Sequence, residues 1–172
     1  EWERGTMEGL LATPLTPGEI LLGKIIPYFI LGMRGMLLSV TLGVNLFGVP
    51  LRGSMLLLVG LSGLFLLASL GLGLFISSAT RVQFVAAMVS VIAGFLPAFF
   101  LSGLLFDLES TPRLVQIISH IIPARYFVTI SQTLFLAGNV WSTLLPAAGV
   151  LALMAAVLLA ATRKKLVRRL PQ

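Results

Sequence analysis

One short motif in this 172-residue chain has the spacing of a nucleotide-binding loop. Residues 18–25 read Gly-Glu-Ile-Leu-Leu-Gly-Lys-Ile, which matches the G-x-x-x-x-G-K frame of a phosphate-binding loop. Ile25 stands where that chemistry needs a serine or threonine hydroxyl to hold Mg²⁺, and no strand pattern precedes Gly18. A capped helix that contains two glycines accounts for the same sequence, so the motif does not indicate nucleotide binding.

The remaining residues do not form a recognisable catalytic set either. The chain has one histidine and no cysteine, which excludes the usual zinc arrangements. Asp107 and Glu109 are the only acids after Glu19, and neither has a base nearby in the sequence. We expect His120 to be packed or at headgroup level, with a proton relay as the alternative. The sequence predicts no catalytic residue, no metal ligand and no cofactor, and therefore a protein that is not an enzyme.

Four long apolar segments dominate the chain and would have to position any functional residue. Each is close to or above the roughly 20 residues that cross a bilayer core as a helix. Hydrophobic residues make up 58% of the sequence and the mean hydropathy is +1.05, which excludes an ordinary soluble domain. The expected spans are Ile25–Gly48, Met55–Ser78, Val82–Leu105 and Thr143–Ala161.

The basic residues predict the orientation of these spans. With four spans and both ends of the chain cytoplasmic, the inner segments hold eight basic residues and the outer segments three. A basic run begins at Arg163, directly after the last span, so the net charge of +6 is explained by topology and lipid contact and does not indicate nucleic-acid binding. A fifth span over 114–137 is rejected because His120, Pro123 and Arg125 lie near its centre.

The organisation expected from this orientation has three parts. Residues 1–24 form a cytoplasmic segment, residues 25–162 a transmembrane bundle, and residues 163–172 a basic cytoplasmic tail. Within the bundle, residues 107–142 form an outer segment. Its apolar patches Leu114–Ile122 and Tyr126–Ala137 are too short to span and too apolar to lie in water, which predicts re-entrant or interfacial helices.

The cytoplasmic segment is patterned as two helices. Met7, Leu10 and Leu11 share one face of an amphipathic helix, whose partner is either the membrane surface or a soluble protein. Thr16 and Glu19 then predict a capping box that starts the helix leading into the first span.

Arg34 is the one ionisable residue within the four expected spans. It lies ten residues past Lys24, about 15 Å deep at helical rise, and shares a face with Thr41 and Asn45. Facing lipid, such a charge would cost at least roughly 2.5–3.5 kcal/mol, so we expect it to face protein or water. These three residues are the candidates for a polar pathway, and snorkelling of Arg34 to the inner interface is the alternative.

Small residues recur at every fourth position of three expected spans. Such ladders let helices approach closely in a membrane, although small residues are also simply common in spans. One ladder runs from Ala148 to Ala160 in the last span. The positions predicted for helix packing in the second and third spans are Ser69, Gly73, Ala86, Ser90, Gly94 and Ala98.

Two blocks of sequence resemble one family. Residues 1–15, which include Glu3-Arg4-Gly5-Thr6, are similar to the E-R-G-T segment of type-2 ATP-binding-cassette exporter permeases. Leu101-Ser102-Gly103 through Phe106, then Pro112-Arg113 and Ile122-Pro123-Ala124-Arg125-Tyr126-Phe127, resembles the outer-face segment of the same family. The resemblance implies that the chain is the C-terminal part of a six-span permease with a large outer domain, and that its first helix is a coupling helix seated on a separate ATPase subunit. The residues expected to couple are Glu3, Arg4, Gly5, Thr6, Met7, Glu8, Leu10 and Leu11.

The sequence therefore predicts an all-α membrane protein with four transmembrane helices, an N-terminal amphipathic cytoplasmic helix and short re-entrant helices at the outer face. The resemblance implies a permease subunit of an ATP-driven exporter in the bacterial inner membrane, paired with a second permease copy and an ATPase subunit. It favours amphipathic efflux substrates. The alternative is a membrane anchor or assembly protein without transport activity.

Overall fold

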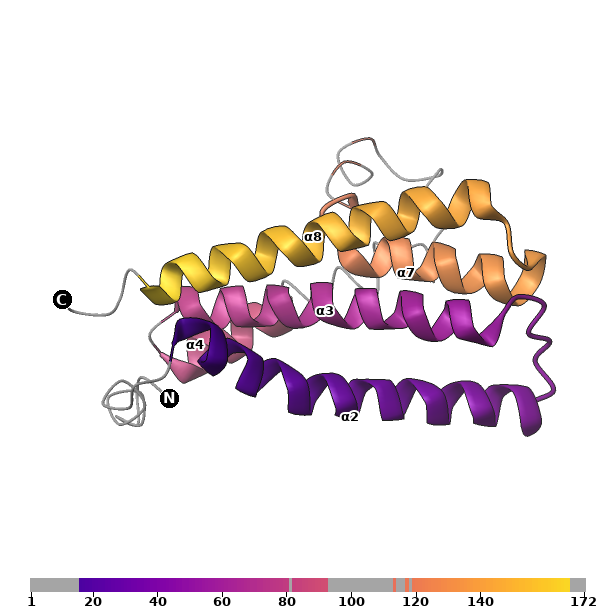
Figure 1. The fold of residues 1–172 in the computed structure, drawn as a ribbon, viewed down its shortest axis with the longest axis horizontal. Helices are drawn as coiled ribbons and strands as arrows, with labels where there is room; N and C mark the ends of the chain where they lie inside the picture. The colour runs from indigo at the N-terminus through magenta and orange to yellow at the C-terminus, as the bar shows by residue number, and fades with distance from the viewer. Residues whose placement is uncertain (1–15, 81, 93–112, 114–116, 118, 168–172) are drawn as a thin grey trace.

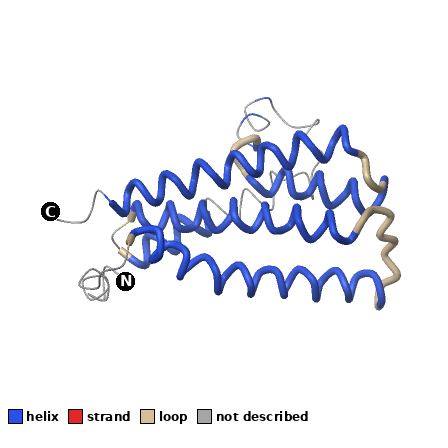
Figure 2. The backbone as a smooth tube through the Cα atoms, viewed as in Figure 1, coloured by secondary structure: helices blue, strands red, loops and turns tan. Residues whose placement is uncertain are grey.

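The computed structural model of the chain describes residues 16–80, 82–92, 113, 117 and 119–167 (Figure 1). All the regular secondary structure in these ranges is helical (Figure 2), which confirms the predicted all-α class. The helices are α2 (Pro17–Asn45), α3 (Met55–Ala79), α4 (Gln83–Ser90), α7 (Pro123–Gln132), the π-helix η3 (Thr133–Ala137) and α8 (Trp141–Val167).

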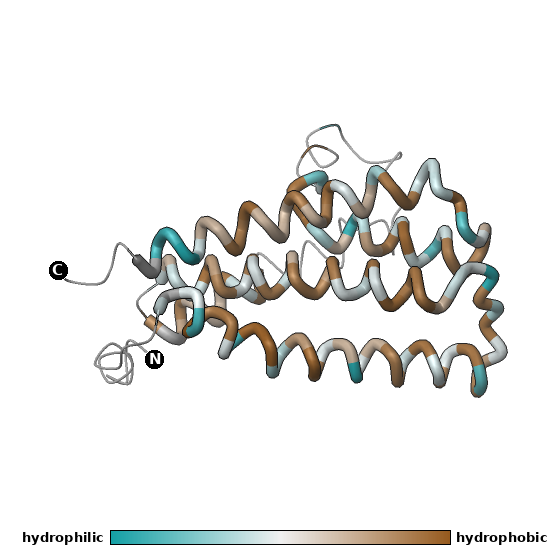
Figure 3. Tube along the Cα trace, in the orientation of Figure 1, coloured by the Kyte–Doolittle hydropathy of each residue, from teal (hydrophilic) through white to brown (hydrophobic). Residues whose placement is uncertain are grey.

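Three of the described helices are long and apolar enough to cross a membrane: Gly18–Asn45, Met55–Ala79 and Trp141–Lys165. They correspond to the first, second and fourth expected spans. The start of the remaining expected span is the helix α4, and residues 93–105 of that span lie outside the described ranges. Figure 3 shows hydrophobic colour along most of the bundle and hydrophilic colour mainly near the helix ends, as a bilayer requires.

The start of α2 is built as its sequence predicts. The Glu19 side chain accepts from the backbone N–H of Thr16 at 2.7 Å, and the Glu19 N–H donates to Thr16 Oγ1 at 3.4 Å. These two bonds form the capping box, and Pro17 occupies the first turn, where its missing N–H removes no helical bond. The predicted capping box is therefore confirmed.

The helix α3 lies at the centre of the bundle, with α2 on one side and α8 on the other (Figure 1). α3 and α8 run in the same direction, whereas α7 runs opposite to α8 beside it. The buried core lies where α3, α7, η3 and α8 meet, and its fully buried side chains include Leu58, Ile130, Leu134 and Leu151. Apolar burial therefore concentrates on one side of α3.

A glycine sets the distance between α3 and α8. A Cβ atom added to Gly71 would lie 3.1 Å from Leu158 Cβ, closer than side chains normally pack. On α8, the face turned to this core carries Leu144, Ala147, Leu151 and Ala155. The neighbouring ladder from Ala148 to Ala160 is half-buried at Ala148 and exposed at the three alanines that follow.

We predict that Gly71→Leu weakens the packing of α3 against α8. The new side chain must displace Leu158 and Leu159, and such overpacking costs about 1–3 kcal/mol. The matched control is Gly60→Leu on the same helix, because a Cβ added at Gly60 meets nothing within 4 Å. Thermal unfolding of the detergent-solubilised protein should show a lower midpoint for Gly71→Leu than for Gly60→Leu. Equal midpoints would contradict this account of the contact.

Candidate functional site

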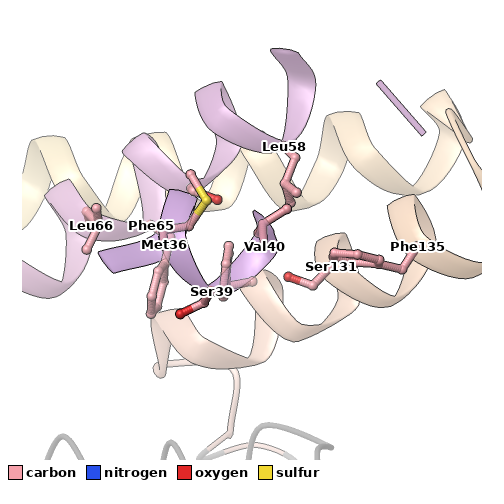
Figure 4. A pocket seen from close by; sticks show the side chains of 10 residues that line it. Met36, Ser39, Val40, Leu58, Phe65, Leu66, Ser131 and Phe135 are labelled. Carbon is pink, nitrogen blue, oxygen red and sulfur yellow. The ribbon is translucent and has the colours of Figure 1, made fainter. Parts of the chain in front are cut away.

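A cavity of about 330 Å³ lies between α2, α3 and the α7–η3 segment (Figure 4). Its walls are mostly apolar, with three phenylalanines and three serines among the lining side chains. The lining residues are Met36, Ser39, Val40, Leu58, Ser62, Phe65, Leu66, Phe127, Ser131 and Phe135. None of these described residues carries a charge, so the cavity is a neutral, largely apolar space with three aromatic rings in its walls.

The aromatic wall joins two helices that are far apart in the sequence. The rings of Phe65 on α3 and Phe127 on α7 stack with centroids 4.3 Å apart and planes inclined by 10°. Both side chains are only half-buried, so the pair is not part of the fully buried core. The stack ties the outer segment to α3 beside the cavity.

The buried serine hydroxyl at the cavity differs from the other helical hydroxyls. Ser62 is 1% exposed, and its Oγ is the one buried side-chain nitrogen or oxygen without a hydrogen-bond partner in the part of the chain described. Other hydroxyls donate to the carbonyl one turn earlier, as Ser39 does to Gly35 at 2.9 Å and Thr162 to Leu158 at 2.8 Å. A buried, unsatisfied polar group costs about 1–3 kcal/mol.

At one end of the bundle, the α2–α3 connection is clasped to the η3–α8 connection (Figure 2). The Gly53 N–H donates to the Leu134 carbonyl at 2.8 Å, and the Ser54 N–H donates to Asn139 Oδ1 at 2.8 Å. Arg52 Nη1 donates to the Leu136 carbonyl at 3.1 Å. Carbonyls at the end of a helix lack intrahelical partners, and this clasp satisfies two of them from another segment.

Gly138 makes the turn after η3 possible. Its φ of +90° lies in a region that side chains with a Cβ rarely adopt. The Gly138 N–H donates to the Thr133 carbonyl at 2.8 Å, which closes the π-helix before the chain enters α8. The clasp and this turn therefore fix the position of Phe135 and Ser131 at the cavity.

The start of α7 is held by a second polar cluster. Arg125 Nη1 donates to the buried Ser119 hydroxyl and lies 3.1 Å from His120 Nδ1. The Tyr126 hydroxyl donates to the His120 carbonyl at 3.0 Å. These contacts give the Arg-Tyr pair of the outer-face motif a structural role: it ties the preceding turn to the helix.

The three pathway candidates lie on the outer face of α2, away from the cavity. Arg34, Thr41 and Asn45 are all exposed, and none lines the cavity. Thr41 Oγ1 donates to the Leu37 carbonyl at 2.7 Å and Asn45 Nδ2 to the Thr41 carbonyl at 3.0 Å, so both polar groups bond within their own helix. Their role in a pathway stays a prediction.

Of the other residues predicted from the sequence, some lie within the described structure and others lie outside it. Ser69, Gly73, Ala86 and Ser90 are half-buried, and a Cβ added at Gly73 would meet nothing within 4 Å in the described structure. Gly94, Ala98 and the eight expected coupling residues between Glu3 and Leu11 lie outside the described ranges. The described residues hold no cluster of three or more histidine, cysteine, aspartate or glutamate side chains that could bind a metal.

Sequence reasoning missed the cavity. Ser62, Phe65 and Ser131 belong to no motif, and Phe127, which ends the outer-face motif, carried no expectation of a cavity. All four are ordinary residues for apolar helices. The distances along the chain are also large, since Phe127 comes 62 residues after Phe65. Only the docking of α7 beside α3 brings these side chains together.

The sequence matches the family described as ABC-2 family transporter protein over residues 1–164. It is 55% identical over 140 residues to the Escherichia coli K12 protein named "Probable multidrug ABC transporter permease YbhS", covering 81% of this chain and 37% of that protein. It is 31% identical over 150 residues to "Probable multidrug ABC transporter permease YbhR", covering 85% and 40%, and 33% identical over 145 residues to "Inner membrane transport permease YhhJ", covering 80% and 37%, both also from E. coli K12. No solved structure matches the chain.

The chain therefore belongs to the ABC-2 family of transporter proteins, and the resemblance seen in its motifs is confirmed. This family consists of membrane components of transport systems rather than enzymes. The chain spans about two fifths of the length of the curated relatives that it matches, which fits a C-terminal part of a permease.

We predict that Asn139→Ala loosens the clasp at the end of the bundle. The Ser54 N–H would lose its partner, and the loss of one neutral hydrogen bond should speed its exchange with deuterium about twofold to tenfold. Asn45→Ala is the matched control, because the Asn45 amide bonds only within α2. Hydrogen–deuterium exchange followed by mass spectrometry measures both variants. An unchanged exchange rate at Ser54 in Asn139→Ala would contradict the clasp.

Proposed function

We propose that this chain is part of the permease subunit of an ATP-driven exporter in the bacterial inner membrane. The observation that carries the proposal is the 55% identity to YbhS, a protein named as a probable multidrug permease, over 81% of the chain. The described helices are consistent with it, because three of them can cross a membrane and pack against one another. Amphipathic efflux substrates are the class that the relatives' names favour.

The proposed orientation places both ends of the chain in the cytoplasm. The clasped end of the bundle then faces outward, and α7 with η3 enters the membrane from that side as a re-entrant helix. The length of this segment supports the arrangement, since 10 residues of α-helix and 5 of π-helix are too few to span. Lys165 lies at the opposite end, where its Nζ is 4.5 Å from the centre of the Phe75 ring.

A second permease copy is the proposed neighbour of the exposed small-residue faces. The alanines at positions 152, 156 and 160 of α8 are exposed. Small residues at this spacing suit close contact with another helix in a membrane. A Cβ added at the half-buried Gly73 of α3 would meet nothing within 4 Å, so this position also retains room for a partner. These surfaces fit a dimer in which two permease copies line the path.

Coupling to an ATPase subunit is proposed for residues 1–12, where Met7, Leu10 and Leu11 form an apolar helix face. We predict that Leu10→Asp in the full-length permease uncouples ATP hydrolysis from transport. Loss of an apolar contact at the centre of a docking surface costs about 2 kcal/mol or more, which weakens ATPase binding roughly 30-fold. Transport into inverted vesicles and co-purification of the ATPase measure the effect.

The control for this substitution is Glu1→Ala, on the polar face of the same expected helix. It should leave transport and co-purification at their original levels. Membrane insertion should be equal in both variants. If Leu10→Asp transports and co-purifies with the ATPase like the original protein, this segment is not the docking surface.

Arg34 is proposed to contribute to the translocation path, because it is exposed within an apolar span and lipid would penalise it there. Its face of α2 is open to a second copy or to other segments of the permease. We predict that Arg34→Ala changes which compounds stimulate ATP hydrolysis by the partner, with little loss of assembly. The measurement is ATPase activity of the reconstituted complex across a panel of amphipathic compounds.

Arg34→Lys separates the two roles considered for this residue. A lysine keeps the charge but not the planar group, so a pathway role predicts a response that differs from that of Arg34→Ala. Snorkelling to the interface predicts that both variants keep the original stimulation profile. A profile insensitive to both substitutions would remove Arg34 from the pathway.

A further inference from the structure

We propose that the C-terminal end of α8, together with Phe75 of α3, binds the headgroup of an anionic phospholipid. Arg163 and Lys164 contact the phosphate group, and Lys165, held against the Phe75 ring, adds a third positive charge beside it. The acyl chains lie along the exposed apolar face of α8. The inference depends neither on the orientation of the chain in the membrane nor on its role in transport.

The basic side chains at this end have no counter-charge in the described part of the chain. Arg163 and Lys164 are exposed and Lys165 is half-buried, all near the end of α8, where Figure 3 shows hydrophilic colour. Glu19 is the only acidic residue among the described residues, and its carboxylate already accepts two hydrogen bonds from Thr16. The complementary partner is therefore an anion from outside the described structure.

A cation–π contact holds Lys165 at the junction of α3 and α8. Its Nζ lies 4.5 Å from the centre of the Phe75 ring, one helical turn after Gly71, where α3 packs against Leu158 of α8. The ring covers one side of the ammonium group, and an ammonium group has three N–H donors, so donors remain for a phosphate oxygen. Because the side chain is already held, it loses less conformational freedom on binding than an unrestrained lysine.

The length of α8 places these charges at the level of phospholipid headgroups. The helix begins at Trp141, and at 1.5 Å per residue, positions 163–165 lie about 33–36 Å farther along its axis. The hydrocarbon core of a bilayer is about 30 Å thick, or about 40–45 Å with both headgroup layers. With Trp141 at one interface, where indole rings are favoured, the basic residues lie among the headgroups of the other.

Apolar side chains beside Lys164 favour a lipid over a soluble anion. Leu153 and Val157 are exposed on α8 and precede Lys164 by 11 and 7 residues, which places all three on one face of the helix. Inorganic phosphate has no group that would contact this apolar surface. A phospholipid contacts the basic residues with its headgroup and the apolar residues with its acyl chains.

Native mass spectrometry of the full-length permease in detergent measures this binding directly. Phosphatidylglycerol has a net negative charge, and phosphatidylcholine with the same acyl chains has none. We expect phosphatidylglycerol to bind with the lower Kd. Arg163→Gln and Lys164→Gln should each raise this Kd about threefold to fivefold, because each removes one positive charge at the headgroup. Both variants should leave the Kd of phosphatidylcholine unchanged.

Three further variants separate charge, position and packing. Lys164→Arg keeps the charge and should keep the Kd of phosphatidylglycerol. Arg52→Gln is the matched control, because Arg52 is an exposed arginine in the clasp at the opposite end of the bundle, and it should also leave this Kd unchanged. Phe75→Leu removes the ring but no charge, and it should raise the Kd about twofold to threefold through the loss of the contact with Lys165.

Glycerol 1-phosphate distinguishes a lipid from a soluble phosphate, because it carries the phosphate without acyl chains. It should not displace phosphatidylglycerol at equal concentration, and displacement would overturn the lipid as the ligand. The site itself is wrong if the two phospholipids bind with equal Kd, or if Arg163→Gln and Lys164→Gln bind phosphatidylglycerol like the original protein. An unchanged Kd in Phe75→Leu would overturn the positioning of Lys165 by the ring.

Discussion

The hydrogen bond from the Gly53 N–H to the Leu134 carbonyl, with those of Arg52 and Ser54 beside it, joins two parts of the chain that are far apart in the sequence. The last carbonyls of a helix have no partner within the helix, so the end of η3 takes partners from another segment of the protein. The α7–η3 segment ends at Ala137 in this way, and residues 52–54 together with Asn139 complete its bonding. The position of α7 and η3, and with it one wall of the cavity, depends on this clasp.

Packing against α3 extends the same arrangement along the bundle. The close approach at Gly71 brings α8 against α3, and Leu134, Leu144 and Leu151 fill the space between α7 and α8. On its other side, α3 is met by α2, where Gly32 lies against Leu66 and Phe29 against Gly63. The helix α2 is much less buried than α3. In the most apolar 18-residue stretch of each helix, 6% is buried in α2 and 33% in α3.

The limited burial of α2 gives it two distinct surfaces. Met36, Ser39 and Val40 turn toward the cavity, whereas Arg34, Thr41 and Asn45 remain exposed on another face. A movement of α2 relative to α3 would therefore change both the volume of the cavity and the environment of Arg34.

The sequence by itself determined the helical class, the positions of three long apolar helices to within a few residues at most of their ends, and the family of the protein. These properties are local: a run of apolar residues predicts a span, Thr16 and Glu19 predict a helix start, and the blocks around Arg4 and Arg125 carry the family resemblance. The chain's coupling residues and the rest of the span that follows α4 stay predictions, because they lie outside the described ranges.

Only the tertiary structure decided which faces of these helices pack against one another. A uniformly apolar helix can present small residues on several of its faces. Neither a ladder of small residues nor hydropathy then tells which face packs against a neighbouring helix. Gly71 and Leu151 lie in the contact between α3 and α8. By contrast, a Cβ added at Gly73 would meet nothing within 4 Å, and Ala152 is exposed. The cavity was likewise beyond the sequence, because Ser62 and Phe127 become neighbours only through long-range docking of α7, which depends on side-chain shape and on the clasp at Gly53 and Asn139.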